Sequence, residues 1–381
     1  MVWRGPPLRQ HPARAAAKKA GRGGRGGMRH AGFASTVPGV LPYNAGMRRL
    51  VLSLLLAAAA IAAGFSGYWV YLAHRLQAEI GPWAEAQRAH GTALGWDSLA
   101  VEGFPLAVRL RFAQVTASGE KPLPFTAVAP LLLAETAVWD GRQWRIDAPD
   151  GARAALPGEA GGLVAASLHG SVGLDGAGGA TIELAGQRIA GSGIAAGTDV
   201  AAAELRLTLP DHAAGNHLDP AFAAALRLTD LSLPVTVPSF GKDIETLSLA
   251  VTLKGALPPG KLRETLAAWR RDGGTLELTD GVLRWGALEA DANGTFALDD
   301  QLQPIGALTA AIENHNAIID AAVAGGTLRA GDADLVKILL GLMAKPGADG
   351  RKRLTLPVSV QNDRLYLGPA QIAVLPRFTW E

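Results

Sequence analysis

The chain has 381 residues, of which 49% are hydrophobic and only 6% aromatic, and its 47 glycines and 23 prolines predict an apolar core interrupted by many turns. It has no cysteine, which excludes disulfides, thiolate metal sites, iron–sulfur clusters and a cysteine nucleophile. The net charge of +2 hides an asymmetry, because residues 1–49 carry ten basic and no acidic side chains and the remainder carries 26 basic and 34 acidic ones. An acidic body argues against binding to nucleic acid.

Residues 1–46 are predicted to be a disordered basic leader, because they contain few large apolar side chains to bury. Within them, residues 21–27 have the composition of a short RGG box, which is typical of disordered RNA-binding segments. We favour a different interpretation, in which Met47 is the true start and the leader is a misassigned extension. Met47-Arg-Arg-Leu is an ordinary beginning for a membrane-anchored protein.

Residues 50–73 carry no charge and predict a transmembrane helix. These 24 residues would span ~36 Å, enough to cross a ~30 Å hydrocarbon core. The preceding Arg48 and Arg49 place the N-terminus in the cytoplasm and the acidic body across the membrane, by the positive-inside rule. A signal peptide cleaved after Ala62 is the alternative, but the apolar run continues beyond that site. The predicted anchor residues are Leu50, Leu54, Leu55 and Ile61, with Tyr68, Trp69 and Tyr71 at the far headgroup level.

The predicted organisation is therefore a transmembrane anchor at 47–73, a short helical extension at 74–90 and a β-rich body at 91–381. Apolar and polar residues alternate with period two in several parts of this body, which predicts strands at residues 106–112, 204–209, 246–254, 275–279 and 354–360. Turn-forming dipeptides between strands are predicted at Asp140-Gly141, Asp280-Gly281 and Asn293-Gly294.

Two segments of the body have the period of an α-helix, residues 261–271 and residues 332–344, the latter with Leu335, Ile338, Leu339 and Leu342 on one stripe. So little helix cannot cover a dozen half-apolar strands. The predicted fold is mainly β, with long twisted antiparallel sheets that form a groove, a sandwich or an open barrel. The apolar face of these strands must meet another sheet, curl onto itself or face an apolar ligand. Burial alone favours the first two.

The motifs that could support catalysis are each incomplete. Residues 255–262 match the spacing of a phosphate-binding loop, but Leu262 replaces the magnesium-binding hydroxyl and two prolines remove backbone donors, so a turn before a helix is favoured. His212 and His217 have no third imidazole nearby and are predicted to lie in a solvated loop. His315 is predicted to be a turn residue, and Ser192 lacks the GxSxG pattern of a nucleophile. We therefore predict no catalytic residue, no metal, no cofactor and no enzymatic activity.

Four short stretches occur in order beyond the anchor: residues 101–106 (VEGFPL), 139–144 (WDGRQW), 283–306 (with LRWGAL, GTFAL and PIG) and 364–369 (RLYLGP). Together they resemble an uncharacterised family of anchored envelope proteins of Gram-negative bacteria, the domain-of-unknown-function family 2125, over residues 47–381. The resemblance implies an inner-membrane anchor, a periplasmic body and no catalytic residues. Residues 274–308 and the tail are also similar to AsmA-like proteins, which implies a β-groove and a role in lipid movement or outer-membrane homeostasis.

These observations predict a non-enzymatic, inner-membrane-anchored periplasmic protein that binds or passes phospholipid or another apolar molecule in envelope maintenance. The alternative is a periplasmic scaffold that recruits other proteins without binding lipid, and a hydrolase is a weaker alternative still. The apolar lining is predicted at Leu247, Leu249, Val251, Leu253, Leu276 and Leu278, although ordinary core packing would explain the same residues.

Overall fold

The apolar run forms part of one long helix, α1 (Ala45–Ala89), which continues through Pro82 beyond the predicted anchor. The computed structural model describes residues 45–119, 124–155, 161–237, 240–326, 328–346, 350–368 and 370–380, so the predicted leader lies almost entirely outside the described residues. Within the described ranges, α1 is the only helix long and apolar enough to cross a membrane. The chain divides into two units, residues 1–59 and 60–381, and the second contains all of the strands.

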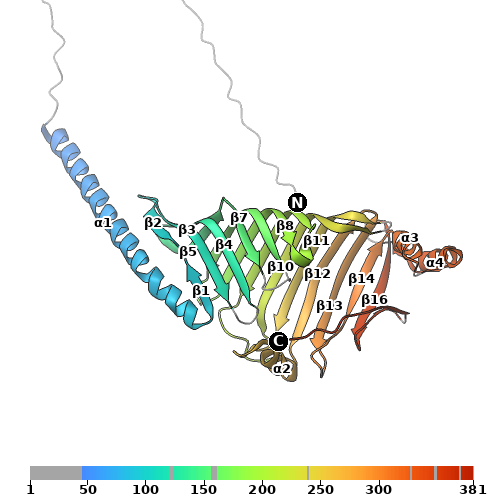
Figure 1. Cartoon of the computed structure of the whole chain (residues 1–381). Coiled ribbons are helices and arrows are strands. Elements are labelled where there is room, and N and C mark those ends of the chain that lie inside the picture. The colour runs from blue at the N-terminus through green and yellow to red at the C-terminus, as the bar shows by residue number, and fades with distance from the viewer. Residues whose placement is uncertain are drawn as a thin grey trace, which may run out of the picture. The chain divides into compact units, whose positions relative to one another are not determined.

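The strands form one antiparallel sheet and follow one another across it almost in chain order (Figure 1). Both β1 and β2 pair with β3. Strands β5 and β6 lie between β4 and β7, and from β7 to β14 each strand pairs with the next. The sheet ends with β14, β16, β17 and β18, while β15 adds to β16. Among the described residues no pairing joins the first strands to the last, so the sheet is open. The bounds are β1 (Thr92–Gly95), β2 (Ser98–Glu102), β3 (Ala107–Gly119), β4 (Phe125–Ala137), β5 (Asp140–Ala148), β6 (Ala152–Ala155), β7 (Gly162–Leu174), β8 (Ala180–Ser192), β9 (Asp199–Leu209), β10 (Pro220–Val237), β11 (Gly241–Lys254), β12 (Thr275–Trp285), β13 (Leu288–Leu298), β14 (Pro304–Glu313), β15 (Lys345–Pro346), β16 (Lys352–Gln361), β17 (Arg364–Leu367) and β18 (Ala370–Val374).

Three further α-helices accompany the sheet in the described residues: α2 (Leu262–Arg271), α3 (Asn316–Ala324) and α4 (Ala330–Met343). The two predicted helices are confirmed as α2 and α4, within two residues at each end. The prediction of only two was wrong, because α3 was missed. That helix is only nine residues long, its polar side chains are limited to Asn316 and Asp320, and His315 precedes it without a side-chain cap, so its helical period gives a weak signal.

The predicted strands are confirmed, but the predicted turns were wrong. Asp140-Gly141 begins β5, and the turn before it is Val138-Trp139. Asp280-Gly281 lies inside β12, where the pairing register shifts at a bulge. Asn293-Gly294 lies inside β13, where a Cβ on Gly294 would stand 2.4 Å from the carbonyl oxygen of Ala307. Here glycine accommodates a close neighbouring strand instead of a hairpin turn.

Left-handed residues inside three long strands keep the apolar side chains on one side of the sheet. Gln114 in β3, Arg188 in β8 and Asp230 in β10 have φ of 50°, 48° and 50°. Strict alternation would put Leu228 and Leu231 on opposite faces of β10. Instead they pack in one cluster with the buried Val200 and Ile244, because the left-handed residue between them turns the strand.

Candidate functional site

One face of the sheet is apolar across its whole width. In antiparallel strands, directly paired residues lie on the same face. Leu249 of β11 pairs with Leu226, Leu226 with Leu205, and Leu205 with Leu184, so one row of leucines crosses β8 to β11. Parallel rows extend it, and we define the apolar face by its large side chains on β7 to β12: Leu168, Val172, Leu174, Ile182, Leu184, Leu205, Leu207, Leu209, Phe222, Leu226, Leu228, Leu247, Leu249, Val251, Leu253, Leu276, Leu278 and Leu283.

All six predicted lining residues lie on the apolar face. Val251 pairs with Leu278 and Leu253 with Leu276, while Leu247 pairs with Leu283. None of the six is buried, and the side chain of Leu249 is 38% exposed. The hydrophobic clusters in the described residues join only neighbouring strands and helices, and no second sheet covers this face. The sandwich, one of the two arrangements favoured by burial alone, is therefore not formed in the described residues.

Helices cover the two ends of the apolar rows and leave the middle open. At one end Phe65, Trp69, Leu72, Leu76 and Ile80 of α1 pack against the buried Val108 and Leu110 of β3. At the other end Ile318 of α3 and Leu340 of α4 pack against the cluster that contains Leu354 and Leu356 of β16. The six strands β7 to β12 lie between these two covers. At ~4.8 Å per strand they present an apolar surface ~24 Å wide.

A polar group without a partner lies at the edge of this surface. The indole nitrogen of Trp285 is buried, and no hydrogen-bond acceptor reaches it among the described residues. The Trp285 ring packs on Phe240, with ring centroids 5.2 Å apart, and contacts the cluster of Val200, Leu231 and Ile244. A buried N–H without an acceptor is unfavourable.

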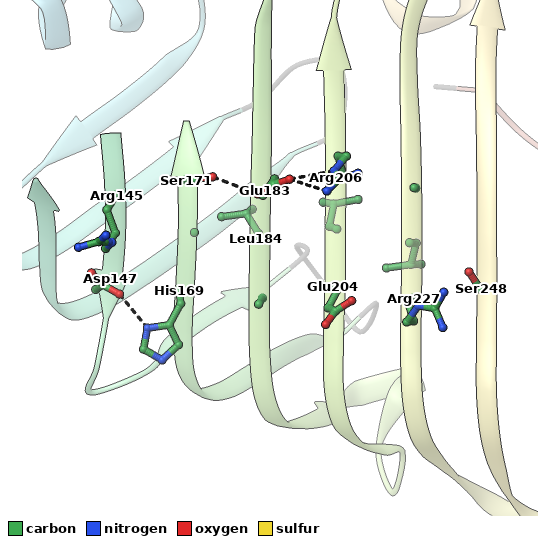
Figure 2. A pocket seen from close by; sticks show the side chains of 15 residues that line it. Arg145, Asp147, His169, Ser171, Glu183, Leu184, Glu204, Arg206, Arg227 and Ser248 are labelled. Carbon is green, nitrogen blue, oxygen red and sulfur yellow. Dashed lines mark hydrogen bonds and ion pairs between the residues drawn. The ribbon is translucent and has the colours of Figure 1, made fainter. Parts of the chain in front are cut away.

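The opposite face is polar, and several of its charges pair across the strands. This face has a depression of about 750 Å³, lined by charged side chains from β5 to β10 and by Ser248 of β11. Figure 2 shows these side chains. Asp147 accepts a hydrogen bond from His169 at 2.8 Å, and Arg206 donates to Glu183 at 2.9 Å (Figure 2). Such exposed pairs contribute little stability individually, but together they identify the charged face of the sheet.

This polar depression places three residues of catalytic type on adjacent strands, which the sequence analysis missed. Asp147 of β5 pairs directly with His169 of β7, and Ser171 lies two residues further along β7. Only the strand register brings these residues together, and no sequence motif indicates that they lie close to one another. However, the Ser171 hydroxyl donates to Glu183 at 3.2 Å. A serine nucleophile needs a base to accept its proton, and here the nearest hydrogen-bonded base is a carboxylate that also pairs with Arg206.

The other motifs form hydrogen-bonded loops. Asp219 accepts hydrogen bonds from Asn216 and from the backbone of Gly215 close to His217, and His212 contacts Asp211. The phosphate-loop-like segment is a turn before α2, where Thr265 donates to the carbonyl of Pro258. Among the described residues no three His, Asp or Glu side chains are grouped closely enough to hold a metal ion.

The predicted anchor residues lie on α1 and, with one exception, are exposed. Arg48 and Arg49 lie directly before its apolar part. Trp69 is the residue that is not exposed, because its indole N–H donates to the carbonyl of Ala107 at 2.7 Å. The exposed anchor side chains are Leu50, Leu54, Leu55, Ile61, Tyr68 and Tyr71.

Comparison with known proteins identifies one family. The family whose model matches is described as "Uncharacterized protein conserved in bacteria (DUF2125)", and the match covers residues 69–376. It confirms the family resemblance read from the sequence, whereas the similarity to AsmA-like proteins is not confirmed by it. No curated protein and no solved structure matches the chain.

Proposed function

The chain belongs to the DUF2125 family of bacterial proteins, and we propose that it is a non-enzymatic, membrane-anchored protein whose apolar face binds the acyl chains of a lipid or a similar apolar molecule. The observation that carries this proposal is the uncovered apolar face on β7 to β12. Exposed apolar patches of this extent are typical of binding surfaces. Its ~24 Å width exceeds the ~15 Å that acyl chains span in one leaflet of a ~30 Å core.

The location we propose is the inner membrane, with the sheet in the periplasm. α1 is long and apolar enough to be a single-pass anchor. Arg48 and Arg49, which adjoin the N-terminal end of the apolar run, support this orientation, because positive flanks stay in the cytoplasm. An open apolar surface attached to a membrane would suit the binding or passing of lipid in envelope maintenance.

The test uses the two faces of one strand as a matched pair. Leu249 lies on the apolar face, whereas the adjacent Ser248 lies on the polar face and lines the depression there. The photoreactive residue p-benzoylphenylalanine would replace each in turn in the full chain, in native membranes. Irradiation at position 249 should yield an adduct with the mass of a phospholipid, and irradiation at position 248 should not. Because the adduct is mapped to its residue, lipid around α1 cannot mimic the result.

A second measurement tests whether the apolar face is open or is packed as a core. Val251→Asp on the uncovered face should reduce the lipid adduct at position 249 while costing less than about 1 kcal/mol of stability, whereas an unpaired charge in a filled core would cost several. Ser248→Asp, opposite Arg227, is the control. A large fall in melting temperature for Val251→Asp would contradict the open face. Protein adducts without lipid at position 249 would favour the scaffold alternative instead.

A further inference from the structure

Two turns at the edge of the sheet expose three large apolar side chains together. Phe104 and Leu106 lie between β2 and β3 and are 56% and 61% exposed, and Trp139 lies between β4 and β5 and is 71% exposed. The turns are bonded to each other, because the backbone N–H of Val138 donates to the carbonyl of Leu106 at 3.2 Å. No charged residue occurs in residues 103–108 or 136–139. We call Phe104, Leu106 and Trp139 the apolar foot.

The apolar foot is fixed to the membrane-exit end of the anchor. The ring of Trp69 meets Phe104 edge-on, with centroids 5.6 Å apart, and its N–H donates to Ala107. Val138, the neighbour of Trp139, is 5% exposed and packs in the cluster that includes Phe65 and Trp69 of α1. The foot therefore moves with this part of α1 and not with a flexible linker.

The position of Trp69 along the anchor sets the depth of the foot. Trp69 is the twentieth residue of the run that begins at Leu50. Twenty helical residues span ~30 Å, which equals the thickness of the hydrocarbon core, so Trp69 falls at its far boundary. Tryptophan and tyrosine favour this headgroup level, and Tyr68 and Tyr71 flank it. Any side chain in direct contact with Trp69 is at or near the same level.

We propose that the apolar foot inserts into the headgroup region of the membrane that α1 crosses, on the far side from Arg48 and Arg49. Its occupant is the lipid surface, because the same helix that holds the foot leaves the bilayer beside it. The inference depends on α1 being a membrane anchor and not on ligand binding by the apolar face. It places the β3 end of the sheet on the bilayer, where lipid would first meet the protein.

The test measures depth with a single label. The chain has no cysteine, so Leu106→Cys in the full chain can be labelled with the fluorophore NBD in phosphatidylcholine vesicles. Leu218→Cys is the matched control, since Leu218 is also an exposed leucine in a turn, 67% exposed between β9 and β10. Tyr68→Cys marks the anchor. Doxyl groups placed high on the lipid chains should quench the label at position 106 as at position 68, at the ~5–10 Å depth of interfacial side chains, and leave position 218 unquenched.

Each outcome decides between the proposals. Quenching at 68 and 106 but not at 218 supports insertion of the foot, and quenching at 68 alone overturns it. No quenching at 68 would overturn the anchor and the foot together, while leaving ligand binding by the apolar face to its own test. If Leu106→Cys does not fold, Trp139→Cys at the other turn takes its place with the same expected result.

Discussion

At the scale of single residues, Asp175 stabilises the hairpin between β7 and β8. Its carboxylate accepts hydrogen bonds from the backbone N–H groups of Gly179, Gly178 and Ala177 at 2.6, 2.8 and 3.0 Å. Partial desolvation raises the pKa of this carboxyl, but the three donors outweigh that effect and hold the pKa below its ordinary value of 3.8. Hydrogen bonds to the charged form of a carboxyl stabilise that form and so lower the pKa.

A pH dependence follows for Asp175. A carboxyl whose pKa is lower in the folded state stabilises the fold above its unfolded pKa, and this contribution is lost as the pH falls through the folded pKa. Asp175→Ala should therefore lower the melting temperature of the detergent-solubilised chain at pH 7, and the difference from the unchanged chain should shrink below pH ~4. Asp150→Ala, in the exposed turn before β6, is the control. An equal difference at pH 7 and pH 3 would contradict the assignment.

At the scale of elements, Trp269 fixes α2 to the end of the sheet. Its side chain is 4% exposed, and its indole N–H donates to the carbonyl of Lys254 at the end of β11. The ring lies against Gly274, where a Cβ would stand 2.2 Å from the indole nitrogen. Glycine is required at this position because the ring occupies the space of a side chain.

A substitution at Gly274 tests this packing. Gly274→Ala should displace Trp269 and destabilise the chain by about 1–3 kcal/mol, as overpacking does, with a loss of near-ultraviolet circular dichroism from the indole. Gly341→Ala is the matched control, because nothing lies within 4 Å of the Cβ it would add on α4. Alanine is also the better helix former there, so this variant should be neutral or stabilised by up to about 1 kcal/mol. Equal effects of the two variants would refute the packing argument.

Sequence alone predicted the elements better than their connections. Leu247, Leu249, Val251 and Leu253 alternate with polar residues, and a period-two pattern fixes which residues share a face wherever the strand is regular. Leu106 was expected on the face of Val108, but it lies in a turn and is exposed, because its pattern extends one residue beyond β3. Residues that bend strands, such as Asp230, carry no such periodic signal. The pairing of Asp147 with His169 depends on register, which local sequence does not encode.

At the scale of the whole molecule, the apolar foot and the uncovered apolar face follow one another along the sheet. The apolar foot lies beside β3, whose apolar side chains are covered by α1. The uncovered apolar face follows on β7 to β12, and α3 and α4 cover the far end at β16. An apolar molecule that left the bilayer at the foot would meet the open strands only after it passed α1. On the proposals for the apolar face and the apolar foot, the helix would both anchor the sheet and limit access to it.

This order requires that the sheet lie across the membrane from residues 1–46, and the charges near the anchor predict that orientation. Only Lys and Arg within ~15–20 residues of a transmembrane end count toward the positive-inside rule. On the N-terminal side Arg48 and Arg49 satisfy that limit, whereas Arg29 lies 21 residues before Leu50. On the other side Arg75 and Arg88 compete with them. Arg48 and Arg49 both adjoin the run, whereas on the other side only Arg75 does and Arg88 lies 15 residues beyond Ala73, so the balance favours the N-terminal side by one nearby arginine.

Alkaline phosphatase fused after Glu381 should be active, because the enzyme needs disulfides that form only in an oxidising compartment, and a green fluorescent protein fusion should be dark. Arg48→Gln with Arg49→Gln should lower the phosphatase activity per molecule and raise the fluorescence, since the remaining basic flank then lies on the body side. The control, Arg4→Gln with Arg9→Gln, removes two charges that lie too far from the run to count, and should change neither reading. Unchanged activity in the first pair would show that Arg48 and Arg49 do not set the orientation. A fluorescent fusion to the unaltered chain would place the sheet in the cytoplasm and remove the periplasmic lipid from reach of the apolar face.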